Sequence, residues 1–161
     1  MGHNVIPAFF AQHQLEALTM ENELLQEMQA AATDRTDLEL RSLLGCFLFT
    51  GDDVFKKIKV LSGGEKARIA LAKTLISGAN FLLLDEPTNH LDMQSINILA
   101  EALRAYEGTV IMVSHDRYFI KEVADAIWWI EDQEVKKYPG VYDEFLDYQS
   151  KRDLSKPSEK K

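Results

Sequence analysis

Two adjacent carboxylates follow the first of three continuous apolar runs in the chain. Residues 81–84 read Phe-Leu-Leu-Leu, and Asp85 and Glu86 come directly after them. Open α/β sheets bind their ligands beyond the carboxyl ends of the strands. There, one carboxylate can hold Mg²⁺ through its water shell while the other accepts a proton from attacking water. The alternative interpretation is a solvated turn that begins with Pro87 and Thr88.

A histidine follows the second apolar run in the same way. Residues 110–113 read Val-Ile-Met-Val and are followed by Ser114, His115 and Asp116. Parallel strands end at one edge of a sheet, so this pattern predicts that His115 lies near the carboxylate pair. A simple helix start is the alternative, with Asp116 as its N-cap.

The segment Ser62-Gly63-Gly64-Glu65 also supports two interpretations. Ser62 and Glu65 have the spacing of a capping box, in which both side chains satisfy free backbone N–H groups at a helix start. A capping box does not require two glycines, however. Gly63 and Gly64 would leave backbone N–H groups open at the positive end of a helix, which suits a phosphate.

The elements that must position these residues alternate between strand and helix. The apolar runs are 81–84, 110–113 and 126–130, and helical patterns cover 65–76, 95–106 and 116–124. This alternation predicts an α/β fold with a mostly parallel sheet flanked by helices. Upstream, we expect a short edge strand at 5–10, interrupted by Pro7, and a helical layer built from helices at 15–32 and 37–47.

Length and composition favour one compact domain. The chain has 161 residues, 46% of them hydrophobic, and a formal charge of −8, which argues against binding nucleic acid over the whole surface. No apolar stretch approaches the length of about 20 residues that a membrane span needs. The single cysteine, Cys46, has no partner for a disulfide or a zinc site. These features predict a cytoplasmic protein.

Taken together, the motifs resemble those of the ATP-binding cassette (ABC) family. Residues 61–65 are similar to its signature motif, 81–86 to its Walker B strand, and 114–117 to its switch-histidine region. Residues 10–12 resemble its Q-loop and 91–92 its D-loop. Five short matches in the right order cover nearly the whole chain.

The resemblance implies a role for each matching residue. Asp85 and Gln12 would help to hold Mg²⁺, while Glu86 would act as base for the attacking water and His115 would contact the γ-phosphate of ATP. Asp92 would link two ATP sites, because the family sandwiches ATP between two cassettes. Ser62, Gly63, Gly64 and Glu65 would form the signature that binds the ATP held by the partner cassette.

One family motif does not occur in these 161 residues. None of the eight glycines begins a G-x-x-x-x-G-K-[ST] phosphate loop, which the family places upstream of the Q-loop. We therefore expect a truncated nucleotide-binding domain at 1–149, with a helical subdomain at about 15–60, that is inactive alone. The family strand leading into that loop would lie beside residues 81–84, so the resemblance also implies an unpaired strand there and a marginally stable, associating chain.

The subgroup is indicated by the string at 85–92. Asn89-His90 at this position resembles the ABC-F proteins, whereas transporter cassettes more often carry another pair here and Gln in place of Glu65. ABC-F proteins carry two cassettes and many act on the ribosome. The short segment between Gln12 and Ser62 favours the second cassette, because the first usually holds an inserted arm. Residues 150–161 would be a charged flexible tail. A transporter ATPase subunit and a non-catalytic binding module remain as alternatives.

Overall fold

The computed structural model describes residues 2–11, 16–89 and 91–155. Two compact units divide these residues. The first unit runs up to His115, and the second begins at Asp116. Each is described by itself below.

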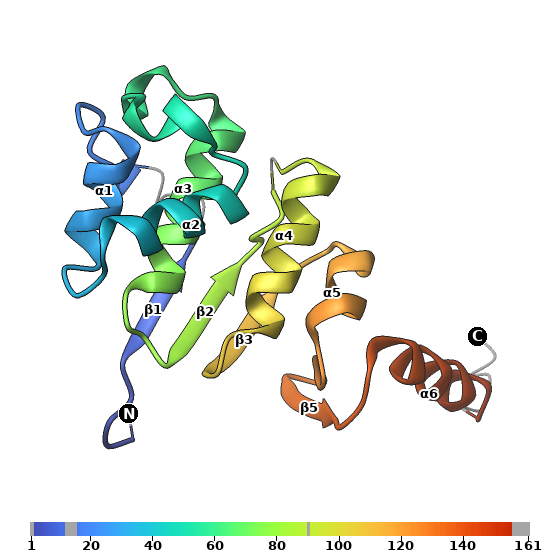
Figure 1. Cartoon of the computed structure of the whole chain (residues 1–161). Coiled ribbons are helices and arrows are strands. Elements are labelled where there is room, and N and C mark those ends of the chain that lie inside the picture. The colour runs from blue at the N-terminus through green and yellow to red at the C-terminus, as the bar shows by residue number, and fades with distance from the viewer. Residues whose placement is uncertain (1, 12–15, 90, 156–161) are drawn as a thin grey trace. The chain divides into compact units, whose positions relative to one another are not determined.

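A three-stranded parallel sheet forms the base of the first unit (Figure 1). It consists of β1 (Pro7–Phe10), β2 (Phe81–Asp85) and β3 (Thr109–Val113), in the order β1-β2-β3. In its register Phe10 pairs with Leu84 on one side of β2, and Asp85 pairs with Val113 on the other. The predicted parallel sheet is thus confirmed for these strands.

The position of β2 in this sheet corrects one expectation. β2 is hydrogen-bonded on both sides, so the prediction that residues 81–84 lack a neighbour is wrong. β1 occupies the side that the resemblance had left open. Pro7 is compatible with this arrangement because β1 is an edge strand, where a missing N–H can face away from the ladder. The expected instability therefore loses its physical reason.

Helix α4 (Met93–Arg104) connects β2 to β3 as a parallel crossover. Its buried apolar side chains, Ile96, Leu99 and Leu103, recur at helical spacing and form one face. Asp92 begins the helix, since its carboxylate accepts a hydrogen bond from the backbone N–H of Ser95 at 2.8 Å. Asp92, the N-cap of α4, lies seven residues after Asp85, so one short segment carries both carboxylates.

Three helices gather on one side of the strands in Figure 1. They are α1 (Leu24–Ala31), α2 (Asp37–Cys46) and α3 (Gly63–Ile76), with two 3₁₀ helices, η2 (Gly51–Phe55) and η3 (Ile58–Val60), between α2 and α3. The predicted helices at 37–47 and 65–76 are confirmed. The predicted continuous helix at 15–32 is wrong, because α1 starts only at Leu24. Residues 16–23 form short 3₁₀ and turn conformations instead, and Glu23 makes an isolated antiparallel bridge with Lys57 just before η3. Within η3, Ile58 N–H donates to Asn22 O and Lys59 N–H to Met20 O.

A buried carboxylate joins α1 to α3. The Glu27 side chain is fully buried, and its two oxygens accept hydrogen bonds from Lys73 Nζ at 2.5 Å and from Asn22 Nδ2 at 2.8 Å. Burial raises the pKa of Glu27, but the Lys73 and Asn22 contacts outweigh it and hold this pKa below its usual value. The pair therefore fixes the helical group through a charged contact in its interior.

The second unit contains α5 (Arg117–Val123), β4 (Ile127–Glu131), β5 (Glu134–Tyr138) and α6 (Tyr142–Ser155). β4 was expected to join the parallel sheet, but it pairs antiparallel with β5. The reason is local. Asp132 and Gln133 have φ values of 55° and 64°, which is the conformation of a two-residue hairpin turn between the strands.

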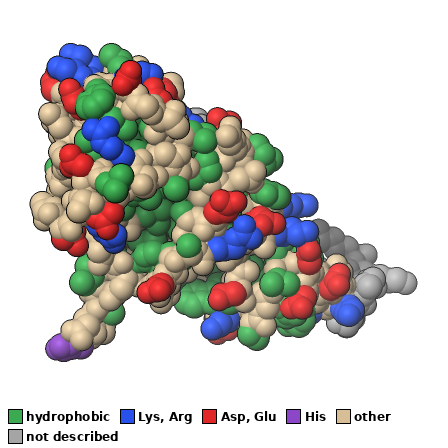
Figure 2. All heavy atoms as spheres, viewed as in Figure 1, with side chains coloured by type: hydrophobic (Ala, Val, Ile, Leu, Met, Phe, Trp, Pro, Cys, Tyr) green, Lys and Arg blue, Asp and Glu red, His purple; other side chains and the backbone are tan. Residues whose placement is uncertain are grey.

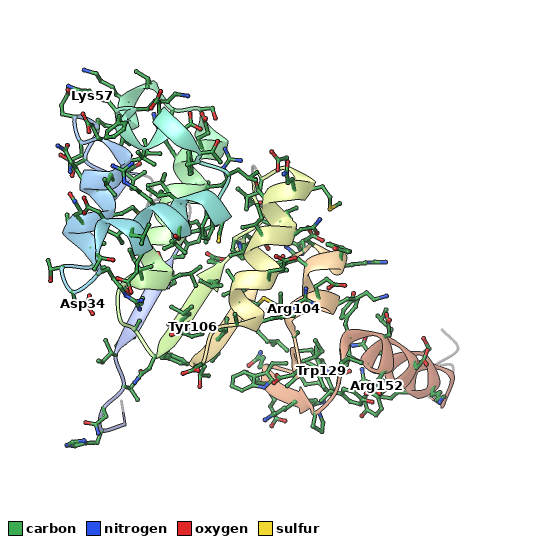
Figure 3. All side chains as sticks on the ribbon, viewed as in Figure 1. Asp34, Lys57, Arg104, Tyr106, Trp129 and Arg152 are labelled. Carbon is green, nitrogen blue, oxygen red and sulfur yellow. The ribbon has the colours of Figure 1, made fainter. Side chains whose placement is uncertain are left out.

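Helix α6 packs its aromatic residues on this hairpin. The Trp129 ring lies 5.2 Å from Phe145, and the Arg152 guanidinium lies over the same indole (Figure 3). Arg152 also donates to both carboxylate oxygens of Glu131, at 2.7 and 3.0 Å. These contacts extend the helix to Ser155, so residues 150–155 are helical and do not begin the expected flexible tail. Residues 156–161 lie outside the described residues.

Candidate functional site

The carboxylate pair lies at the carboxyl end of β2, and its second member has an unusual backbone. Glu86 N–H donates to Val113 O at 2.8 Å, which ties the residue after β2 to the end of β3. Its φ is +46°, in the left-handed region that residues with a Cβ seldom occupy. Such strain persists where surrounding contacts hold it, often at functional sites. No residue type near Glu86 predicts this conformation.

The structure brings Glu86 and His115 together, as the sequence predicted from the shared sheet edge. One carboxylate oxygen, Oε2, accepts a hydrogen bond from the His115 backbone N–H at 3.3 Å, and the other, Oε1, lies 3.5 Å from His115 Nε2. The His115 side chain is 95% exposed, whereas that of Glu86 is 22% exposed. The imidazole can therefore reach a ligand from solvent without leaving the carboxylate.

Glu86 Oε1 is free to accept a hydrogen bond from a ligand or a water molecule. The atom is buried and has no hydrogen-bond partner within the described part of the chain. A buried carboxylate oxygen left in this state is unfavourable unless a donor completes it. A water molecule held beside His115 would supply that donor, which is the arrangement a general base needs.

Asp85 ends β2 as an exposed side chain opposite Val113. Among residues 2–11, 16–89 and 91–155, no group of three or more acidic, histidine or cysteine side chains gathers around a common point. Mg²⁺ rarely needs such a cage, since one or two carboxylates and the phosphates of a nucleotide usually suffice. Asp85 fits that mode of binding. Gln12, the other residue expected at the metal, lies outside the described residues.

The signature segment forms the capping box that its spacing predicts. Ser62 Oγ accepts from the Glu65 backbone N–H at 3.3 Å, and Glu65 Oε2 accepts from the Ser62 backbone N–H at 2.8 Å. Hydrogen bonds to the Glu65 carboxylate, first from the Ser62 backbone N–H and then from the Ser62 hydroxyl, hold the pKa of Glu65 below its usual value. Gly63 is exposed, and a Cβ added to it would meet no atom within 4 Å. Open space at Gly63 leaves the helix N-terminus accessible, so the capping box and an approaching phosphate are compatible. Gly64, the other glycine of the signature, is half-buried in the first turn of α3.

Asp92 stands at the start of α4, a short turn after Glu86. Asn89 N–H donates to Glu86 O and Leu91 N–H to Thr88 O, each at 3.1 Å, so the connection is a compact hydrogen-bonded turn. The pKa of Asp92 is held below its usual value by the Ser95 backbone N–H, then by the Ser95 hydroxyl and the positive charge of Arg68. The structure thus places Asp85, Glu86 and Asp92 on one continuous segment.

Sequence reasoning missed Arg68 as a member of this region. It lies on α3, and its guanidinium NH1 lies 3.3 Å from Ser95 Oγ at the start of α4. A basic residue in a helix is usually solvated, so its type alone gives no signal. The available signal was its place one and a half turns after the signature on the same helix.

The family model described as "ABC transporter" matches residues 4–89, which is more than half of the chain. The chain belongs to the ABC transporter family. Relatives named as ABC-F proteins agree with the subgroup expected from Asn89-His90, so the ABC-F resemblance is confirmed.

Three of these ABC relatives illustrate how the chain compares. It is 46% identical over 146 residues to the putative ATP-binding protein YdiF of Bacillus subtilis, and 43% identical over 145 residues to ABC transporter F family member 5 of Arabidopsis thaliana. It is 41% identical over 155 residues to the probable ATP-binding protein YheS of Haemophilus influenzae. These alignments cover 91%, 90% and 94% of this chain but only 23%, 21% and 24% of the relatives. The chain therefore spans less than a quarter of their length.

Solved structures give the same ABC fold. One is the crystal structure of the complex of archaeal ribosomal stalk protein aP1 and archaeal ribosome recycling factor aABCE1, with a TM-score of 0.66 and 25% identity, covering 86% of this chain and 26% of that one. RNase-L Inhibitor matches with a TM-score of 0.65 over 94% of this chain and 31% of its own, at 23% identity. In the part of the chain described here, none of the helices has both the length and the apolar character required to cross a bilayer.

Proposed function

We propose that this chain supplies the hydrolytic and signature residues of an ABC-F ATPase that acts in translation in the cytoplasm. Its cofactors are ATP and Mg²⁺, and its partner for catalysis is a second ABC cassette. The observation that carries the proposal is the Glu86 carboxylate, held in a left-handed conformation with one buried oxygen unsatisfied beside His115.

The chemistry at this site is the transfer of a phosphoryl group to water. Glu86 Oε1 accepts a hydrogen bond from the water and takes its proton as the water oxygen attacks the γ-phosphorus. The bond from that phosphorus to the bridging β-phosphate oxygen breaks, so that ADP leaves with this oxygen and its electron pair. His115, exposed 3.5 Å away, donates to an oxygen of the γ-phosphate. Asp85 and Gln12 would hold Mg²⁺ through oxygen ligands, and the bound ion would supply positive charge beside the phosphates.

The signature half serves a different nucleotide. Ser62, Gly63, Gly64 and Glu65 present the N-terminus of α3 to ATP held by the partner cassette. In that closed form Ser62 Oγ turns from the Glu65 N–H to the phosphate. Asp92 lies at the junction and connects the two sites through the start of α4.

Association with the ribosome is supported by the proteins to which this chain is similar. Its structural neighbour is a ribosome recycling factor bound to a ribosomal stalk protein, and its sequence relatives are named as ABC-F members. Figure 2 shows acidic and basic side chains mixed over the visible face, without one extended basic surface. We therefore expect contacts to a ribosome to involve local features of both charges.

The decisive experiment restores a phosphate loop. The segment that precedes the matching region in the Bacillus subtilis relative is placed before Met1, and ATP turnover is measured for the chimaera and its Glu86→Gln variant. Gln keeps the size of Glu but cannot accept the proton, so the rate should fall by about a hundredfold while ATP still binds. Glu101→Gln, an exposed change on α4, is the matched control and should leave the rate unchanged. An unaltered rate in Glu86→Gln would refute the assignment of the base.

Two further readouts separate parts of the proposal. The 161-residue chain alone should show no saturable ATP binding at millimolar nucleotide, because the lysine and backbone amides of a phosphate loop supply the main phosphate contacts. The ATP-bound Glu86→Gln chimaera should co-sediment with ribosomes in a sucrose gradient. Failure to co-sediment, with ATP binding intact, would remove the translational role and leave the ATPase assignment standing.

A further inference from the structure

Arg68 makes contacts that a solvated helix residue would not make. Its guanidinium stacks on the buried ring of Phe49, 5.0 Å from the centroid, and its NH1 donates to Ser95 Oγ at 3.3 Å. Ser95 is itself 97% buried, with 3% of its surface exposed. Three segments that are far apart in the sequence therefore meet at one side chain.

The charge of Arg68 also acts on three carboxylates from these segments. It lowers the pKa of Asp53 in η2, of Glu65 in the signature capping box, and of Asp92 at the start of α4, in each case as a contribution secondary to local hydrogen bonds. A single cation that favours all three ionised forms lies between the signature and the D-loop segment. The planar fork of arginine can stack and donate at the same time, which lysine cannot do.

We propose that Arg68 is a positioning residue that ties the signature helix α3 to the start of α4, so that Ser62 and Asp92 keep a fixed relative placement. The tie runs from Arg68 to the Ser95 hydroxyl and from the Ser95 N–H to Asp92 Oδ1 at 2.8 Å. The turn between Glu86 and Asp92 then connects it to the hydrolytic carboxylate. The consequence for two ATP sites rests on the proposed function, whereas the tie itself does not.

The contact has a close counterpart elsewhere in the chain that serves as a control. Arg41 stacks on the Phe55 ring, also 5.0 Å from its centroid, but Phe55 is 50% exposed and belongs to η2. Arg41→Met removes a stacked guanidinium of the same kind without touching α4. Any effect common to Arg41→Met and Arg68→Met would come from losing a stacked cation in general.

Amide hydrogen exchange of the 161-residue chain, without nucleotide, tests the tie. The reporters are the N–H groups of Ser95 and Ile96, which donate to Asp92 Oδ1 and Asp92 O. Arg68→Met and Ser95→Ala should each raise their exchange by about fivefold, the effect expected for the loss of one typical hydrogen bond. The double variant should exceed neither single variant by more than about twofold, because both remove the same bond. Arg41→Met should leave these amides unchanged.

Titration of the Asp92 carboxylate separates positioning from general packing. Arg68→Met should raise the pKa of Asp92, because the cation is lost, whereas Arg68→Lys should restore it. The proposal is overturned if exchange in folded Arg68→Met stays within about twofold of the unmodified chain, or if the two single effects multiply in the double variant. If Arg68→Met does not fold, Ser95→Ala decides instead: exchange of the Ile96 amide within about twofold of the unmodified chain overturns the proposal. Because no nucleotide is present, this result is independent of the Glu86→Gln rate.

Discussion

Replacing Lys73 by methionine tests the buried carboxylate that joins α1 to α3. Methionine keeps the length of the side chain but leaves Glu27, which is fully buried, without its cation. Removing one partner of a buried pair costs about 3–5 kcal/mol in the free energy of unfolding. Lys73 retains 32% exposure and Asn22 still donates at 2.8 Å, so we expect a smaller cost, about 2–3 kcal/mol at pH 7.

The pH dependence of this loss has a definite sign. In the unmodified chain the folded-state pKa of Glu27 is depressed, so its contribution is present above its unfolded value and is lost as pH falls through the folded pKa. In Lys73→Met, burial acts without the opposing cation and raises the pKa of Glu27. The variant therefore gains stability as Glu27 takes up a proton, and the difference between the two chains narrows from pH 7 towards pH 4.

Urea unfolding followed by circular dichroism, at several pH values, measures this difference. Lys57→Met is the matched control, because Lys57 pairs at 3.4 Å with Glu21 at the outer end of the helical group and both side chains are about half exposed or more (Figure 3). That change should leave the free energy of unfolding nearly unchanged, because solvent screens a pair this exposed. A Lys73→Met effect that stays constant between pH 7 and pH 4, or that equals the Lys57→Met effect, would refute the reasoning.

Three other changes have simple expected outcomes. Ser62→Ala removes the capping acceptor of α3 and should lower the free energy of unfolding by about 1 kcal/mol, measured by urea titration. Gly108→Ala should lower the melting temperature, because the added Cβ would lie 2.6 Å from the backbone oxygen of Asn80. A melting temperature equal to that of the unmodified chain would show that the loop adjusts freely. Arg152→Met leaves the half-buried Glu131 carboxylate without its bidentate partner. It should increase amide exchange in β4 and α6 but not in β2.

The sequence was sufficient for the elements whose apolar pattern is continuous or clearly periodic. β2, β3, α2 and α3 appear where their patterns indicated, and the common edge of parallel strands was enough to bring Glu86 and His115 together. These predictions succeed because burial on both faces of a strand, or on one face of a helix, leaves a direct record in residue type.

The hairpin in the second unit left no comparable record. β5 reads Glu-Val-Lys-Lys-Tyr. Its charged residues conceal a strand that pairs with β4 and contacts α6 through Tyr138. Its turn contains Asp132 and Gln133 at positive φ instead of the Asn-Gly or Asp-Gly that would have indicated it. The apolar run of β4 therefore predicted a strand of the parallel sheet instead of half of a hairpin.

The contacts of long side chains were equally hidden. Glu27 and Lys73 are 46 residues apart, and Arg68 and Ser95 are 27 apart. No local pattern distinguishes these charged helix residues from solvated ones. Only the packing of α1 against α3, and the contact of α3 with the start of α4, show which of them carry structural contacts.

The left-handed backbone at Glu86 implies a conflict between folding and activity at one position. At a φ of +46° glycine is the residue that the backbone favours, by up to about 1 kcal/mol over one with a Cβ. A Glu86→Gly chain would therefore lose the carboxylate and its hydrogen bond from the His115 N–H, but it would relieve the backbone strain and remove the unsatisfied Oε1. The glutamate at this position therefore has a backbone cost that must be offset by the contacts or the chemistry of its side chain.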